Sequence, residues 1–179
     1  MTDKTSKIAT WNVRTLHQKG KLENVVKEME RMTLNIVGLA EVRWTGAGSM
    51  KLGSKTLHVI YSGGHTHERG VGISFDVTKA KSLGSWCPNS DRVVVAKLVA
   101  KPLNLGIIQV YVSTSDSEDV EVEKFYEEIE KAKGYPKSQD IIMVVGDFSA
   151  KIGNERVKDV VGPSGTGTVN ERGSRLIEW

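Results

Sequence analysis

Polar side chains that could bind a cation or a phosphate stand at the ends of four apolar runs. Four residues share this position: Asn12 after 8–11, Glu41 after 36–40, Tyr111 after 107–110 and Asp147 after 141–146. Read singly, each is equally well a solvated turn residue, but the repetition predicts one polar cluster at the strand ends of a single core. An amide, two carboxylates and a phenol, with no nucleophilic Ser-His pair, suit Mg²⁺ and a phosphate diester better than acyl transfer.

Strands and helices that alternate along the chain would have to position this cluster. The run 141–145 predicts a strand buried on both faces, because all five residues are apolar and most are β-branched. Leu22, Val25, Val26 and Met29 recur at helical spacing and predict an amphipathic helix over 21–32. With strands at 7–11 and 36–40, this helix makes a βαβ-like unit, which needs a sheet beneath it.

The remaining elements predict two β-rich halves, each with a crossing helix. Further strands are expected at 56–61, 70–75, 92–100 and 107–110, a glycine-bearing loop at 43–49, and a last helix from Ser174. A second helix would begin at a capping box formed by Ser115 and Glu118 and end before Gly134 and Pro136. This order favours an α/β sandwich of two sheets covered by helices.

Composition fits an ordinary globular domain. The 179 residues are enough for one domain with a real core, and 39% apolar and 26% charged residues are typical of such proteins. The single cysteine, Cys87, excludes an internal disulfide and a cysteine-based zinc site, which favours an intracellular, reducing location, nuclear or cytoplasmic. Neither a signal peptide nor a membrane-spanning run is apparent, so no membrane partner is expected.

Charge is unevenly distributed along the chain. Residues 116–131 hold eight acidic and two basic residues, a net charge of −6, so the rest of the chain carries +9 within a total of +3. The basic remainder permits attraction to a polyanion such as DNA, although it is too mild to establish it.

The motifs that carry the polar cluster resemble a known superfamily. Thr10-Trp11-Asn12, Gly38-Leu39-Ala40-Glu41, Val110-Tyr111 and Gly146-Asp147-Phe148-Ser149 are similar, in order, to the endonuclease/exonuclease/phosphatase superfamily. Within it, the apurinic-type endonuclease domains of RTE/BovB-like non-LTR retrotransposons match best, from Lys7 to Trp179. The resemblance implies a four-layer α/β sandwich (DNase I-like) over 7–179, preceded by a disordered 1–6. It also implies cleavage of DNA phosphodiester bonds with Mg²⁺, or Mn²⁺ as an alternative.

The resemblance also implies a role for each residue of the cluster. Glu41 would ligate the metal, and Asn12 would help to hold the metal or the phosphate. Tyr111 would contact the phosphate, while Asp147 would orient or deprotonate the attacking water.

Three residues are expected to face nucleic acid. Arg14 lies in a basic loop after the first strand, and Asn170 by resemblance borders the DNA path, with a polar turn residue as the alternative. Trp44 could stack on a base, although a tryptophan packed over loop backbone is the more usual arrangement.

Two departures from the family pattern bear on activity. Ser149 stands where the family has an asparagine in the catalytic set, and serine is too short to make the same contact. The chain also ends before the strands that carry the family's later Asp and Ser-Asp-His motifs, so the sandwich is expected to be incomplete at its C-terminal end. The exposed edge predicts self-association.

Two functions are therefore weighed. The first is a metal-dependent DNA endonuclease of the retrotransposon target-site nicking type, by descent. The second is a catalytically inactive remnant that acts as a nucleic-acid-binding or protein-interaction domain. A third, phosphoesterase chemistry on phosphoinositides, is less favoured because segments outside the site match the retrotransposon group.

Overall fold

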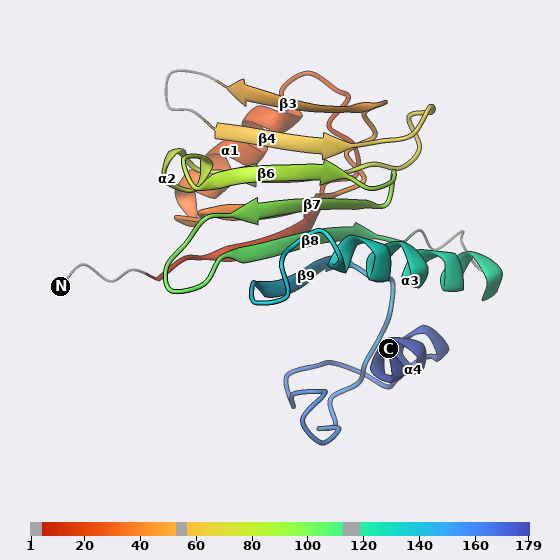
Figure 1. Cartoon of the computed structure of the whole chain (residues 1–179). Coiled ribbons are helices and arrows are strands. Elements are labelled where there is room, and N and C mark those ends of the chain that lie inside the picture. The colour runs from red at the N-terminus through yellow and green to blue at the C-terminus, as the bar shows by residue number, and fades with distance from the viewer. Residues whose placement is uncertain (1–4, 53–56, 113–118) are drawn as a thin grey trace.

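Two β-sheets pack face to face in this computed structural model, which describes residues 5–52, 57–112 and 119–179. The first sheet has the order β1-β2-β5-β4-β3, and the second has the order β6-β7-β8-β9 (Figure 1). The strands are β1 (Ile8–Asn12), β2 (Ile36–Ala40), β3 (Ala47–Leu52), β4 (Leu57–Ser62), β5 (Val71–Phe75), β6 (Leu83–Pro88), β7 (Val93–Leu98), β8 (Leu105–Tyr111) and β9 (Ile141–Asp147). The helices are α1 (Lys21–Arg31), α2 (Val77–Ala80), α3 (Asp119–Lys133) and α4 (Glu171–Glu178).

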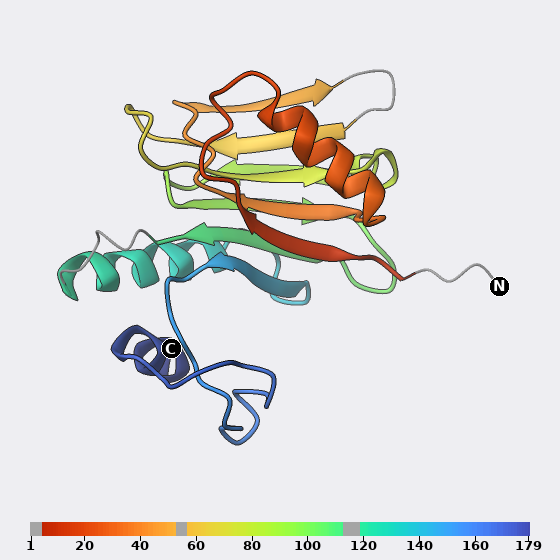
Figure 2. The same cartoon turned by 180° about the vertical axis from the view of Figure 1, so that it is seen from behind.

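Three apolar layers hold the sandwich together. Large buried side chains such as Phe75 and Ile107 fill the space between the sheets. Val25 and Met29 of α1 cover the outer face of the first sheet, and Phe125 and Ile129 of α3 cover that of the second. Seen from behind, α1 lies across the first sheet on the side opposite to α3 (Figure 2). The predicted four-layer α/β sandwich is confirmed.

The strands that carry the polar cluster end on the same side of the molecule. β1 and β2 are parallel, with Asn12 beside Ala40, and β8 and β9 are parallel, with Tyr111 beside Asp147. β1 and β9 are edge strands of the two sheets and lie against each other. The carboxyl ends of four strands therefore meet at one edge of the sandwich.

Several elements differ from the sequence-based expectation. Residues 47–52 form β3, an edge strand with alternating exposure, where a loop was expected over 43–49. Gly46 before the strand and Gly48 within it had hidden the period-two pattern. The short elements β6 and α2 had no predicted counterpart. β9 is not buried on both faces, because it is an edge strand and residues 141–143 are exposed. The capping box expected at 115–118 lies outside the described residues.

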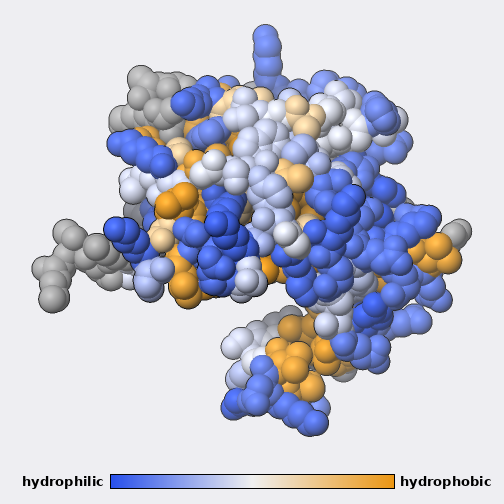
Figure 3. All heavy atoms as spheres, in the orientation of Figure 1, coloured by the Kyte–Doolittle hydropathy of each residue, from blue (hydrophilic) through white to orange (hydrophobic). Residues whose placement is uncertain are grey.

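The segment 150–179 forms a protrusion beside the second sheet and bears apolar patches at its surface (Figure 3). Its helix α4 docks on α3 mainly by polar and aromatic contacts. The Arg175 guanidinium donates to both carboxylate oxygens of Glu123 at 2.6 and 2.8 Å and lies over the ring of Tyr126. In the described part of the chain, no helix has the length and apolar character needed to cross a bilayer.

Candidate functional site

The Asn12 side chain joins the two carboxylates of the site. Its Nδ2 donates to Glu41 Oε1 at 2.8 Å and to Asp147 Oδ2 at 3.0 Å. Its Oδ1 accepts from the Arg14 amide at 3.1 Å, which fixes the orientation of the side-chain amide. Two carboxylates separated by more than one hundred positions in sequence are thereby held within reach of one small ligand.

Glu41 is held ionised by its neighbours. Burial raises the pKa of this carboxyl group, but hydrogen bonds from Asn12, Arg43 and Tyr111 outweigh burial, so the pKa lies below its ordinary value. The Arg43 Nη2 donates to Glu41 Oε2 at 2.9 Å and adds an opposite charge. Glu41 is therefore a carboxylate at any pH near neutrality.

Asp147 is positioned by the backbone around it. Gly146 has a φ of 149°, and an added Cβ there would lie 2.0 Å from the Val110 carbonyl oxygen, so only glycine allows β9 to run this close to β8. The Ser149 amide donates to Asp147 Oδ1 at 2.9 Å. The carboxylate at the end of β9 is thus fixed from both sides.

Tyr111 completes the cluster from the second sheet. The residue is buried, its amide donates to the Arg92 carbonyl at 3.0 Å, and its hydroxyl bonds to the Glu41 carboxylate. The structure therefore brings Asn12, Glu41, Tyr111 and Asp147 together, as the repeated strand-end pattern suggested.

Unusual backbone conformations gather at this edge. Arg14, Glu41, Arg43 and Ser149 are non-glycine residues with φ between 48° and 56°, in the left-handed region. Each such residue costs free energy that the surrounding structure must supply, and such residues concentrate at functional sites. This backbone strain supports a functional role for the cluster.

Ser149 does not extend into the cluster with its hydroxyl. The Oγ donates to the Val112 carbonyl oxygen at 2.9 Å, so the side chain is occupied by a backbone acceptor. Its amide, rather than its hydroxyl, makes the contact with Asp147.

A groove of about 610 Å³ opens next to Asp147, between the edge strands and the segment 150–179. Its lining includes Trp11, Phe148, Lys151 and Asn170. Trp11 is 42% exposed, so its ring is open to solvent at this groove. The sequence predicted Trp11 only as part of a strand motif and not as a site residue.

The three residues expected to face nucleic acid have different surroundings. Arg14 is exposed and follows the site strand β1. The Trp44 ring packs edge-on against Tyr61 at a centroid distance of 4.9 Å, as in the alternative of a tryptophan packed on the protein. Asn170 is the N-cap of α4, with Oδ1 accepting from Gly173 and Lys151 amides, and it also lines the groove.

The donor set suits a hard cation. Each carboxylate offers about four acceptor positions, so the hydrogen bonds to Glu41 and Asp147 leave lone pairs for a metal. Within the described residues, no group of three or more His, Cys, Asp or Glu could hold a metal ion. A two-carboxylate site with an adjacent amide fits Mg²⁺, which retains several water ligands, better than zinc.

The chain is similar in sequence to two curated proteins. The chain is 36% identical over 174 residues to craniofacial development protein 2 of Bos taurus and 35% identical over 175 residues to that of Tragulus javanicus. Each match covers 96% of this chain and 29% or 30% of the relative, so the chain spans less than a third of these relatives' length. No protein-family model matches the sequence.

Solved structures with this fold include nucleases. The endonuclease domain of TRAS1, a telomere-specific non-LTR retrotransposon, superposes with a TM-score of 0.58 at 14% identity, over 97% of this chain and 68% of that one. An AP endonuclease from Archaeoglobus fulgidus gives 0.56 at 19% identity, over 97% and 69%. A 3′ phosphatase, NExo from Neisseria, bound to a product DNA hairpin, gives 0.56 at 18% identity, over 84% and 60%. The resemblance to the endonuclease/exonuclease/phosphatase fold is confirmed.

Proposed function

We propose that this chain binds DNA and hydrolyses a phosphodiester bond in the presence of Mg²⁺, with Mn²⁺ as an alternative ion. The single observation that carries the proposal is the Asn12 side-chain amide, which holds the Glu41 and Asp147 carboxylates together at one strand-end edge. Relatives in fold that act on DNA or are bound to it support DNA as the substrate.

Each residue of the site would have its own role in the reaction. Glu41, with its low pKa, would hold the metal together with the side-chain oxygen of Asn12, the atom of this amide that has lone pairs to offer. The metal would supply positive charge against the negative charge that develops on the phosphate. Asp147, fixed by Gly146 and by the Ser149 amide, would orient the attacking water and accept its proton.

Two further groups would act on the phosphate. The Tyr111 hydroxyl, which bonds to Glu41, would also contact a phosphate oxygen. Arg14, exposed at the end of β1, would attract the DNA backbone and contribute to the salt dependence of binding. We retain Asn170 as a proposed contact at the border of the DNA path and Trp44 as a proposed stacking surface for a base.

A second function is favoured by one specific contact. Because the Ser149 hydroxyl is bonded to the Val112 carbonyl, the position where the family has an asparagine offers no side-chain donor to a phosphate. A chain that has kept the groove and lost this donor would bind nucleic acid or a protein partner without cleaving DNA.

A supercoiled-plasmid nicking assay with Mg²⁺, Mn²⁺ or EDTA separates these functions. We expect metal-dependent nicking that Asp147→Ala and Glu41→Gln abolish, whereas Asp159→Ala, a carboxylate removed from a fully exposed position, leaves it unchanged. Duplex binding that weakens with salt but is never accompanied by nicking would favour the second function. A chain that neither binds nor nicks DNA would contradict both the endonuclease and a nucleic-acid-binding remnant, and would leave only a protein partner for the second function.

Two accompanying proposals concern location and assembly. DNA as substrate and one half-buried free cysteine suit a reducing compartment, nuclear or cytoplasmic. We also propose that the exposed edge strand β9 mediates self-association, because its apolar residues 141–143 are exposed.

A further inference from the structure

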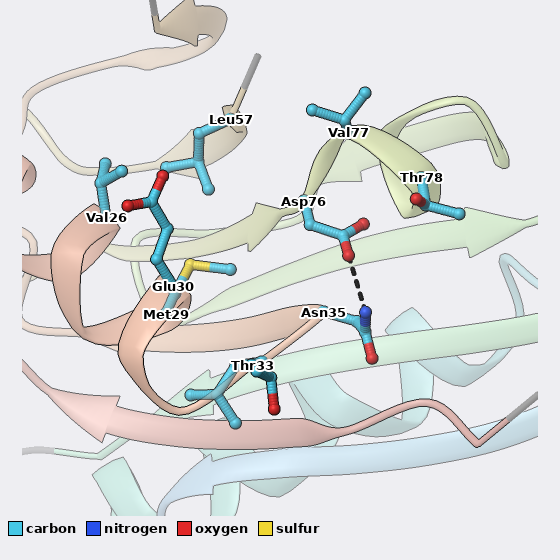
Figure 4. A pocket seen from close by; sticks show the side chains of 10 residues that line it. Val26, Met29, Glu30, Thr33, Asn35, Leu57, Asp76, Val77 and Thr78 are labelled. Carbon is cyan, nitrogen blue, oxygen red and sulfur yellow. Dashed lines mark hydrogen bonds between the residues drawn. The ribbon is translucent and has the colours of Figure 1, made fainter. Parts of the chain in front are cut away.

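A second cavity lies at the opposite end of β2 from Glu41. It has a volume of about 390 Å³ and is enclosed by the end of α1, the connection 32–35, the start of β4 and the start of α2 (Figure 4). Its apolar wall consists of Val26, Met29, Leu34, Leu57 and Val77. A cavity of this size and character is within the range of small-molecule sites in proteins.

The polar part of the lining is acidic. Glu30 and Asp76 are the charged residues among the described lining, which contains no lysine, arginine or histidine. Asp76 is rigidly held: its Oδ2 accepts from Asn35 Nδ2 at 2.6 Å, and its Oδ1 accepts from the Lys79 amide at 2.7 Å and so caps α2. The wall that includes Asp76 is therefore preformed.

Glu30 supplies the carboxylate that can pair with a bound cation. Its carboxylate extends beside Leu57 and Val26 at the cavity, and no hydrogen bond joins it to the other lining residues that are drawn (Figure 4). The cavity also adjoins the C-terminal end of α1, where the helix dipole favours a cation.

Two basic side chains near this helix end, those of Arg31 and Lys7, are already engaged. Arg31 pairs with Glu28 at 2.6 Å. The Lys7 ammonium donates to Thr33 Oγ1 at 2.7 Å. Neither residue lines the cavity, so neither offsets the negative charge of its acidic lining.

We propose that this cavity binds an organic monocation with an apolar body about the size of an indole ring, in the chemical class of the arylalkylamines. The apolar wall would cover the ring, and the amine would face Glu30 at the rim. This site is independent of the proposed phosphodiesterase function, because the two lie at opposite ends of β2.

The test uses tryptamine as the probe in an NMR titration of the ¹⁵N-labelled whole chain. Neutral 3-methylindole and anionic indole-3-propionate serve as probes of similar shape and different charge. We expect tryptamine to shift the amides of residues 26–35 and 76–78 and to bind more tightly than either analogue. Glu30→Gln should weaken tryptamine binding roughly two- to fivefold, the effect of one solvent-exposed ion pair, and leave 3-methylindole binding unchanged.

Glu23→Gln is the matched control, because Glu23 lies on the same helix two turns away and is outside the lining. It should change the affinity for tryptamine little. Equal affinity for the amine and the carboxylate probe, an equal loss in Glu23→Gln and Glu30→Gln, or shifts confined to other parts of the chain would each overturn the proposal.

Discussion

Ser149 combines an unusual backbone conformation with a side chain turned onto the main chain. Its φ is 48°, its amide supports Asp147, and its hydroxyl is bonded to the Val112 carbonyl. Asparagine tolerates the left-handed region better than most residues and would extend an amide donor from the same backbone. The residue at this position can therefore change without disturbing the Asp147 support.

We expect Ser149→Asn to raise metal-dependent plasmid nicking by roughly 10²–10³, the usual contribution of one well-placed donor to a developing oxyanion. Single-turnover nicking rates would measure it. Ser149→Ala is the control: it should cost about 1 kcal/mol of stability through the lost hydrogen bond to Val112 and give no gain in rate. An asparagine variant no faster than the parent would contradict this role.

Gly38 and Gln109 form a second residue pair with a sharp steric requirement. An added Cβ at Gly38 would lie 1.8 Å from Gln109 Oε1, and Gln109 is fully buried, so its amide cannot move away cheaply. We expect Gly38→Ala to destabilise the fold by about 1–3 kcal/mol, as for other overpacked cores. Urea unfolding would measure the change.

The double variant Gly38→Ala, Gln109→Ala tests the cause. Gln109 Oε1 has no hydrogen-bond partner among the described atoms, and Nε2 donates to the Val110 carbonyl at 3.0 Å, so Gln109→Ala removes one hydrogen bond and makes room for the new methyl group. The double variant should thus be more stable than the sum of the two single changes indicates. Strict additivity would show that the two side chains do not compete for this space.

At the scale of elements, Asp140 joins β7 to the connections that precede β8 and β9. The Lys97 ammonium contacts Asp140 Oδ2 at 2.6 Å, and the Asn104 side chain and the Lys137 amide also donate to this carboxylate. The hydrogen bond from Lys97 outweighs burial and lowers the pKa of Asp140 from 3.8 to about 2. A folded-state pKa below the unfolded value stabilises the fold above about pH 4, and this contribution is lost as the pH falls from about 4 to 2.

We therefore expect Asp140→Asn to lower the melting temperature at pH 7 and to flatten the fall of stability between pH 4 and 2. Thermal unfolding followed by circular dichroism across that range would measure both effects. Asp159→Asn, at a fully exposed position, should leave the acid limb unchanged. An unaltered acid limb in Asp140→Asn would assign the acid sensitivity to other carboxylates.

The elements also differ in how far sequence alone predicts them. The helix expected over 21–32 is α1, because its apolar spacing is regular and its amphipathic face is wide. The strand β3 was missed because Gly46 and Gly48 weaken the alternation of its side chains. The exposure of β9 could not be read from its apolar run, since a central strand and an uncovered edge strand share that composition.

At the scale of the molecule, the site is a product of the two-sheet arrangement. Asn12 and Glu41 come from the first sheet, and Tyr111 and Asp147 from the second. The strand-end pattern predicted that these four residues meet. It could not predict that Asn12 would bridge the carboxylates or that Arg43 would pair with Glu41, because both contacts depend on side-chain geometry in the folded state.

The free edge of β9 gives the whole molecule a route to association. Ile141, Ile142 and Met143 are 51%, 39% and 37% exposed, and the strand pairs only with β8. Its five residues 141–145 carry no charge and no proline, the devices that normally prevent edge-to-edge pairing. Antiparallel pairing of β9 with β9 of a second copy would be self-complementary and would bury these side chains about a two-fold axis.

We expect the molar mass from light scattering to rise above that of one chain as the protein concentration increases. Ile141→Lys should restore the monomer, because a lysine at an edge must be desolvated before another strand can pair there. Val160→Lys is the matched control, since Val160 is 67% exposed and lies outside both sheets. If Ile141→Lys and Val160→Lys suppress association equally, nonspecific hydrophobic association is the cause. If the parent chain stays monomeric at every concentration, the β9 edge is not an interface.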